Sequence, residues 1–215
     1  MNLKHSLVFG LMASFALGAM AQSTAAWPTR GPIKLVAVFP PGGSVDQVAR
    51  ILSIPLQAVL GQSVIVENKG GASGSIGAAA VAAAPADGYT FAVVFDTHGV
   101  NPALIPNLPF DSKKDLTPIV LVGTSPMVLA TFAGSEYKTF ADVVAAAKAK
   151  KNVSYGSIGS GSLGHVAMTL LGKNGGIDWA HIPYKGGAPA TTDLMGGQVD
   201  MMFEQMYTAA PSIRS

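Results

Sequence analysis

The sequence predicts an α/β fold in two lobes, each built on a doubly wound and mainly parallel sheet. Strands and helices alternate twice along the 215 residues, once before and once after residue 124. The expected strands are nearly continuous apolar runs, as in parallel sheets that helices cover on both faces. Hydrophobic residues form 49% of the chain and charged residues 12%, against about 25% charged in typical proteins, so a packed core is expected.

The first lobe is predicted over residues 33–124, with three strands connected through helices. Its elements are, in order, a strand at 33–39, a helix at 44–60, a strand at 63–67, a glycine loop at 68–74, an alanine-rich helix at 75–84 and a strand at 90–95. Gly61 ends the first helix, and Pro55 is expected to kink or interrupt it. A short helix near Asn101 and a short strand at 119–122 complete this part of the chain.

The lobe is organised around the turn after the first strand, Val38-Phe39-Pro40-Pro41-Gly42-Gly43-Ser44-Val45-Asp46. Glycines allow a tight turn and a close approach of a ligand to the main chain. Ser44 and Gln47 form a capping-box pattern that marks the start of the helix. The first N–H groups of such a helix lack partners within it and carry partial positive charge, which makes the turn a candidate anion site. The alternative is a well-capped turn without a ligand.

The second lobe is predicted over residues 125–215 and repeats the alternation. Its elements are a strand at 128–132, a helix at 140–150, a strand at 153–157, a second glycine loop at 158–161, a helix at 162–172, a strand at 179–184, a third glycine loop at 185–187, a helix ending near residue 196 and a strand at 199–204. Thr139 caps the first of these helices, and Asp142 is favourably placed in its first turn. The chain is expected to stop just after its last strand.

The N-terminus predicts export. Lys4 precedes an apolar run at 7–19, and Ala19-Met20-Ala21 has the small residues of a cleavage site, so residues 1–21 are predicted to be a signal peptide cleaved after Ala21. The apolar run is shorter than the roughly 20 residues that span a membrane. Residues 22–32 are expected to form a loose leader. Cleavage removes Lys4, which takes the net charge from +2 to 2 − 1 = +1.

Composition and motifs exclude several functions. The chain has no cysteine, which excludes disulfides, thiolate catalysis and cysteine metal sites, and no basic run that would suggest nucleic acid. The four histidines lack metal-ligand spacing. The stretch Gly159-Ser160-Gly161-Ser162-Leu163-Gly164 matches a dinucleotide fingerprint, but no acidic residue ends the next strand. We therefore expect no metal and no cofactor, and a second helix N-terminus open to an anion.

Three pairs of residues leave alternatives open. Ser162 and His165 lie three apart on one helix and suit either a hydrolase pair or a helix cap with a histidine in the first turn. Tyr184-Lys185, at a strand end, suits either a phenol and an ammonium over a ligand or a surface lysine. Asp200 and Glu204 face the same way on the last strand and are expected either to receive a ligand amine or to shape a cleft.

Several ordered stretches resemble the substrate-binding proteins of tripartite tricarboxylate transporters, also called the Bug family. They are the start Trp27-Pro28 to Phe39-Pro40-Pro41-Gly42-Gly43-Ser44 with Asp46 and Arg50, then Val66-Glu67-Asn68-Lys69-Gly70-Gly71-Ala72-Ser73-Gly74, Pro85-Ala86-Asp87-Gly88-Tyr89-Thr90, Asn101-Pro102, Leu108-Pro109-Phe110-Asp111, Tyr155-Gly156-Ser157 to His165, His181-Ile182-Pro183-Tyr184-Lys185-Gly186 and Asp193-Leu194-Met195-Gly196-Gly197-Gln198-Val199-Asp200. The resemblance implies a two-lobed periplasmic-binding-protein (flytrap) fold and no enzymatic reaction. It implies a monomer that captures a small carboxylate, partly through water, for membrane transporter subunits. The rival hypothesis is an exported serine hydrolase that uses Ser162 and His165.

The resemblance also implies where the ligand binds. The expected ligand-binding residues are Phe39, Pro41, Gly42, Gly43, Ser44, Asp46, Thr97, His98, Ser157, Ser160, Gly161, Ser162, His165, Tyr184, Lys185 and Glu204. Family members continue beyond this point and recross to complete the first lobe. The chain is therefore expected to be truncated, to lack the C-terminal return to the first lobe, and to be less stable and less soluble than a longer version.

Overall fold

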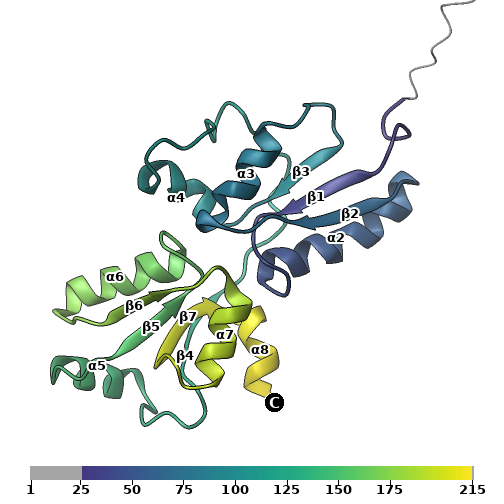
Figure 1. Ribbon diagram of the computed structural model, residues 1–215. Helices are drawn as coiled ribbons and strands as arrows, with labels where there is room; N and C mark the ends of the chain where they lie inside the picture. Colours follow the sequence, from purple (N-terminus) through teal and green to yellow (C-terminus); the bar gives the residue numbers. More distant parts are fainter. Residues whose placement is uncertain (1–25, 215) are drawn as a thin grey trace, which may run out of the picture.

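The computed structural model describes residues 26–214 and shows two α/β lobes, one built on each of two sheets (Figure 1). The predicted signal peptide, residues 1–21, and residues 22–25 of the predicted leader lie outside the described residues. No helix in residues 26–214 combines the length and apolar character needed to cross a membrane.

The first sheet consists of three parallel strands in the order β2-β1-β3. Its strands are β1 (Ile33–Ala37), β2 (Val64–Asn68) and β3 (Thr90–Val93). Helices α2 (Ser44–Leu60) and α3 (Ser75–Ala82) cover opposite faces of the sheet (Figure 1), and the short helices η1 (Ala72–Gly74) and α4 (Thr97–Leu104) lie beside α3. The predicted doubly wound arrangement of this lobe is confirmed.

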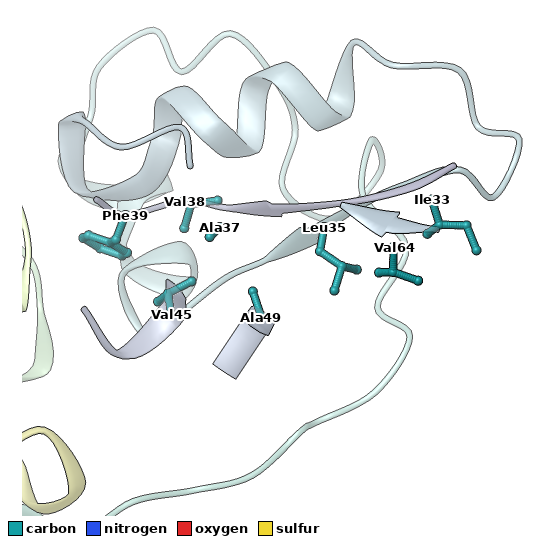
Figure 2. Close-up of a cluster of buried hydrophobic side chains, with 8 residues drawn as sticks. All are labelled: Ile33, Leu35, Ala37, Val38, Phe39, Val45, Ala49 and Val64. Carbon is teal, nitrogen blue, oxygen red and sulfur yellow. The ribbon is translucent and has the colours of Figure 1, made fainter. Parts of the chain in front are cut away.

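A compact apolar core lies between β1 and α2 (Figure 2). Leu35 from the strand and Val45 and Ala49 from the helix are at most 5% exposed. Full burial of a leucine or valine side chain such as Leu35 or Val45 stabilises the fold by about 1.5–3 kcal/mol. The apolar run of β1 and the helical spacing of apolar residues in α2 thus meet on one face, and they fix the position of the turn between them.

The second sheet has the strand order β4-β7-β5-β6, in which β4 alone is antiparallel to its neighbour. Its strands are β4 (Met127–Ala130), β5 (Ser154–Ser157), β6 (Ala180–Pro183) and β7 (Met201–Gln205). Its helices are α5 (Phe140–Lys148), α6 (Leu163–Gly175), α7 (Gly187–Met195) and α8 (Met206–Arg214). The predicted mainly parallel second sheet is also confirmed.

The two helix starts predicted from capping patterns have different outcomes. At α5 the Thr139 hydroxyl accepts the N–H of Asp142 (3.2 Å), and the Asp142 carboxylate accepts the N–H of Thr139 (2.7 Å), which confirms the predicted cap. The capping box predicted from Ser44 and Gln47 is wrong. Gly43, in an extended conformation, takes the cap position of α2, so Ser44 is already the first helical residue and its side chain makes no cap.

Three other expectations need correction. The strand predicted at 119–122 is not formed, because β-rich sequence makes a strand only beside a partner, and Ile119, Val120 and Leu121 are 71–79% exposed. Helix α2 runs through Pro55 without interruption. The chain also does not stop after its last strand, since α8 follows β7 directly.

Residues 105–126, which carry the chain from α4 to β4, contain no helix or strand, and the lobe boundary predicted at 124/125 falls among them.

Candidate functional site

The loops that follow β1, β2, β5 and β6 gather where the two lobes face each other. A cleft of about 370 Å³ lies between them. It is lined from the first lobe by Phe39, Gly71, Ala72, Ser73, Leu104 and Ile105, and from the second lobe by Ile158, Gly159, Ser160, Pro183, Tyr184 and Lys185. Ligands of open α/β sheets bind outside the carboxyl ends of the strands, and this cleft occupies that position in both lobes.

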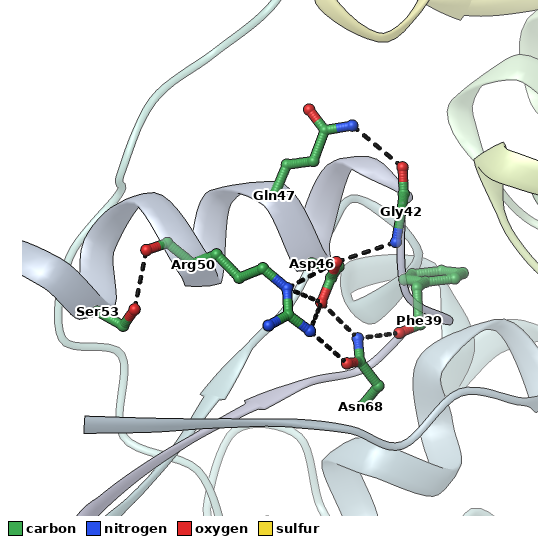
Figure 3. A network of polar contacts seen from close by, with 7 residues as sticks. All are labelled: Phe39, Gly42, Asp46, Gln47, Arg50, Ser53 and Asn68. Atoms are coloured by element: carbon green, nitrogen blue, oxygen red, sulfur yellow. Dashed lines mark hydrogen bonds and ion pairs between the residues drawn. The ribbon is translucent and has the colours of Figure 1, made fainter. Parts of the chain in front are cut away.

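A buried carboxylate shapes the turn after β1 (Figure 3). Asp46, which is 3% exposed, accepts hydrogen bonds from Gly42 N (2.9 Å), Arg50 Nε (3.0 Å) and Asn68 Nδ2 (2.9 Å). Burial by itself would raise the pKa of Asp46, but the hydrogen bonds from Arg50, Gly42 and Asn68 lower that pKa below its ordinary value. The Asp46 carboxylate therefore binds groups of the turn after β1 and its neighbours, and it does not line the cleft.

The first glycine turn packs against the second lobe. Gly42 has a φ of +83°, which favours glycine, and a side chain added there would touch Ala188. A Cβ atom added to Gly186 would lie 3.1 Å from Pro40. The hydroxyl of Tyr207, in α8, donates to the Ser44 carbonyl at 2.6 Å. Of the residues predicted to form this side of the site, Phe39 lines the cleft, whereas Pro41, Gly42, Gly43 and Ser44 do not.

Two more hydrogen bonds join the lobes. The Ser73 hydroxyl donates to the Ser160 carbonyl (2.7 Å), and the N–H of Leu163 donates to Asp96 Oδ2 (2.7 Å). Asn101 helps to hold Ser73 in place, because its Nδ2 donates to the Ser73 carbonyl at 2.9 Å. Two buried atoms on α4, Asn101 Oδ1 and Thr97 Oγ1, have no hydrogen-bond partner within the described part of the chain.

The predicted cap of α6 is confirmed. The Ser162 hydroxyl accepts the backbone N–H of His165 at 3.4 Å, and Ser162 itself is 1% exposed. The His165 ring points elsewhere, since its Nδ1 accepts the N–H of Gly161 at 3.0 Å. The basic nitrogen that a hydrolase would need is thus engaged by the main chain, and the Ser162 hydroxyl serves the helix.

Stacked rings support the second glycine loop. The rings of His165 and His181 stack with centroids 4.1 Å apart, and the ring of Tyr155 also stacks on His181, at 4.9 Å. Ser157 Oγ and His181 Nε2 are 2.7 Å apart and share a hydrogen bond, while the same hydroxyl binds the main chain of Gly159. Burial lowers the pKa of His165, and burial together with the charge of His165 lowers the pKa of His181 to about 4.

We expect the stability of the protein to fall as the pH falls from about 6.5 to 4. The unfolded chain binds the His181 proton near pH 6.5, whereas the folded chain binds it only near 4, so acid favours unfolding in that window. Urea unfolding at pH 7 and pH 5 measures the slope. His181→Phe keeps a stacking ring but cannot titrate, and it should flatten the slope. An unchanged slope in that variant would assign the acid sensitivity to other groups.

The remaining predicted residues divide between the cleft and the interior. Tyr184 lines the cleft and donates its hydroxyl to Asp193 (2.8 Å), and burial and the Asp193 carboxylate raise its pKa to about 12. Lys185 is exposed at the cleft and forms no ion pair within residues 26–214. Glu204 is 3% exposed and accepts a hydrogen bond from Thr191 (3.2 Å), and burial raises its pKa.

The two predicted residues of α4 also lie away from the cleft. Thr97 is buried in α4, and His98 stacks on Phe110 at 6.1 Å, in a separate depression lined by the loop after α4. Asp200 does not act with Glu204, because its carboxylate accepts the N–H and the hydroxyl of Ser154. Across residues 26–214, no three His, Asp or Glu side chains gather closely enough to hold a metal ion.

Sequence reasoning missed Ser73 and Asp96, which carry two of the contacts between the lobes. It also missed the apolar wall of the cleft, Leu104, Ile105 and Ile158. The glycine loop at 68–74 was a signal for Ser73, because it follows a parallel strand as the predicted ligand loops do. Asp96 carried the same signal, because it directly follows the strand predicted at 90–95, and aspartate is a common residue at the start of a helix.

The fold and cleft define a class of protein, a two-lobed α/β binding protein with its site between the lobes. Residues 48–215 match the family described as the tripartite tricarboxylate transporter family receptor. Protein BugT of Bordetella pertussis is 37% identical over 219 residues, which cover 100% of this chain and 67% of BugT. The chain belongs to this family of periplasmic binding proteins, whose members are receptors and not enzymes.

Solved structures agree with this assignment. The periplasmic binding protein BugD superposes with a TM-score of 0.80 at 34% identity, over 86% of this chain and 62% of BugD. Rpa4515 of R. palustris, solved with adipate, superposes with a TM-score of 0.83 at 32% identity, over 88% of this chain and 64% of that protein. The chain spans 62%, 67% and 59% of the length of three curated relatives that it matches.

The hydrolase hypothesis is wrong, since neither the family nor the contacts of Ser162 and His165 supports it.

Proposed function

We propose that this protein is a periplasmic receptor that captures a small carboxylate in the cleft and delivers it to the membrane subunits of a tripartite transporter. The observation that carries the proposal is the cleft itself, which is lined by both lobes and bears the exposed ammonium of Lys185. A lysine without an ion-pair partner at a concave site favours an anionic ligand. Rpa4515, solved with adipate, shows that a relative binds a carboxylate.

The cleft suits a small ligand with an apolar body. Leu104, Ile105 and Ile158 supply apolar surface, and Ser160 and Lys185 supply polar groups. A ligand held in this way contacts both lobes and so favours their closed arrangement. We expect a thermal-shift screen of mono-, di- and tricarboxylates to identify binders, since a ligand at a hundredfold excess over Kd adds about 2.7 kcal/mol of stability. If no small carboxylate shifts the unfolding transition, the proposal fails.

We expect Lys185→Gln to weaken carboxylate binding by about 10- to 100-fold, because a charge-assisted hydrogen bond contributes about 1.5–3 kcal/mol. Isothermal titration calorimetry with the best acid from the screen measures the change. The control is Lys173→Gln, which removes the same charge from the exposed end of α6. Equal affinities for Lys185→Gln and the parent would show that Lys185 does not bind the ligand.

The proposal includes export by the signal peptide at residues 1–21, with cleavage after Ala21. The mass of protein recovered from the periplasm tests the cleavage position. It also includes action as a monomer, which light scattering of the mature protein tests.

A further inference from the structure

One carboxylate spans the two lobes. Asp96 Oδ1 accepts the N–H of Thr97, at the start of α4, and Oδ2 accepts the N–H of Leu163, at the start of α6 in the other lobe, both at 2.7 Å. The first N–H groups of a helix have no partner within it and carry partial positive charge. The protein's own carboxylate therefore occupies the position in which the start of α6 would hold an anion.

The surrounding contacts leave little capacity for a second anion at this end. The N–H of Gly161 is taken by the His165 ring, and the N–H of His165 is taken by the Ser162 hydroxyl. Ser160, which lines the cleft, is only three residues before Leu163. Lys185 also lines the cleft, and its ammonium group has no ion-pair partner among the described residues. Asp96 and Leu163 do not themselves line the cleft. The carboxylate of Asp96 therefore lies beyond Ser160 at the start of α6, whereas the ammonium of Lys185 is in the cleft.

We propose that Asp96 is a specificity-determining residue that restricts the cleft to ligands with a single carboxylate, directed at Lys185. This inference rests on the proposed function. A second ligand carboxylate near the start of α6 has two unfavourable options. It displaces Asp96, which leaves that partly buried side chain without its Leu163 donor, or it lies beside Asp96 and is repelled by the like charge.

The test compares hexanoate with adipate, two six-carbon acids that differ only in the second carboxylate. Calorimetric titration of the parent should show hexanoate binding at least tenfold more tightly than adipate. Asp96→Asn removes the charge and should shift that ratio toward adipate by at least tenfold. Asp178→Asn removes an exposed carboxylate that precedes β6 and should leave the ratio unchanged. Asp96→Ser, which keeps a capping oxygen for α4, replaces the asparagine variant if that variant does not fold.

A second pair of variants acts on the donor. Leu163→Pro removes the N–H that Asp96 accepts, and proline fits because Leu163 is the first residue of α6 and Ser162 is already extended (φ −64°, ψ 155°). Leu163→Ala keeps the N–H and is the control. Since Asp96 retains its charge in Leu163→Pro, this variant should not gain adipate binding. A gain equal to that of Asp96→Asn would show that loosening of the lobes sets the selectivity, and would overturn the role of Asp96.

The remaining outcomes separate the two proposals. If the parent binds carboxylates but Asp96→Asn changes hexanoate and adipate binding by the same factor, only the role of Asp96 is overturned. The same conclusion follows if the parent already prefers adipate. If the parent binds no carboxylate of any length, the proposed function fails, and the selectivity inferred from it fails with it.

Discussion

Gly164→Ala should destabilise the protein by about 2–4 kcal/mol, although alanine is the better helix former. Gly164 is the second residue of α6 and is buried against β7. A Cβ atom added there would collide with the carbonyl oxygen of Phe203, which belongs to the β7 backbone and cannot rotate away. The helix must therefore move off the sheet. Urea unfolding measures the loss of stability.

Gly99→Ala is the matched control. Gly99 also lies in a helix, α4, and has no atom within 4 Å of an added Cβ. There the same substitution should leave stability unchanged or raise it by up to about 1 kcal/mol. Equal effects of the two substitutions would mean that helix propensity, and not the close approach of α6 to β7, decides the outcome at Gly164.

Asp46→Ala should cost about 2–4 kcal/mol of stability and also weaken carboxylate binding at least tenfold. The substitution leaves the N–H of Gly42 and the amide of Asn68 without their acceptor, and it removes the ion pair with Arg50 (2.9 Å). The turn after β1 then loses the contacts that position it beside the cleft. Urea unfolding and calorimetric titration measure the two effects.

Arg50→Gln separates the ion pair from the rest of this network. The Arg50 side chain is 55% exposed, so losing the ion pair alone should cost at most about 1 kcal/mol. A similarly small effect for Asp46→Ala would show that the buried carboxylate does not organise the turn. The sequence singled out Asp46 as a ligand-binding residue, whereas its contacts assign it this supporting role.

Local sequence patterns predicted well those features that depend on residues close together in the chain. The cap formed by Thr139 and Asp142 spans four residues, and it forms as predicted. The capping box at Ser44 failed by one residue, because Asp46 accepts the N–H of Gly42 and the helix starts after Gly43. The strand at 119–122 failed because strand formation requires a neighbouring strand, which no local pattern reveals.

By itself, the sequence determined the alternation of strands and helices, the two mainly parallel sheets, the glycine loops at the carboxyl ends of their strands and the family resemblance. Each of these is encoded in short apolar runs, caps and turns. Only the tertiary structure decided which loop residues meet. The bond from Ser73 to Ser160 joins residues 87 positions apart, and that from Leu163 to Asp96 joins residues 67 apart. Such contacts depend on how the two sheets face each other, and this is set by the packing of the whole chain and not by any local run of residues.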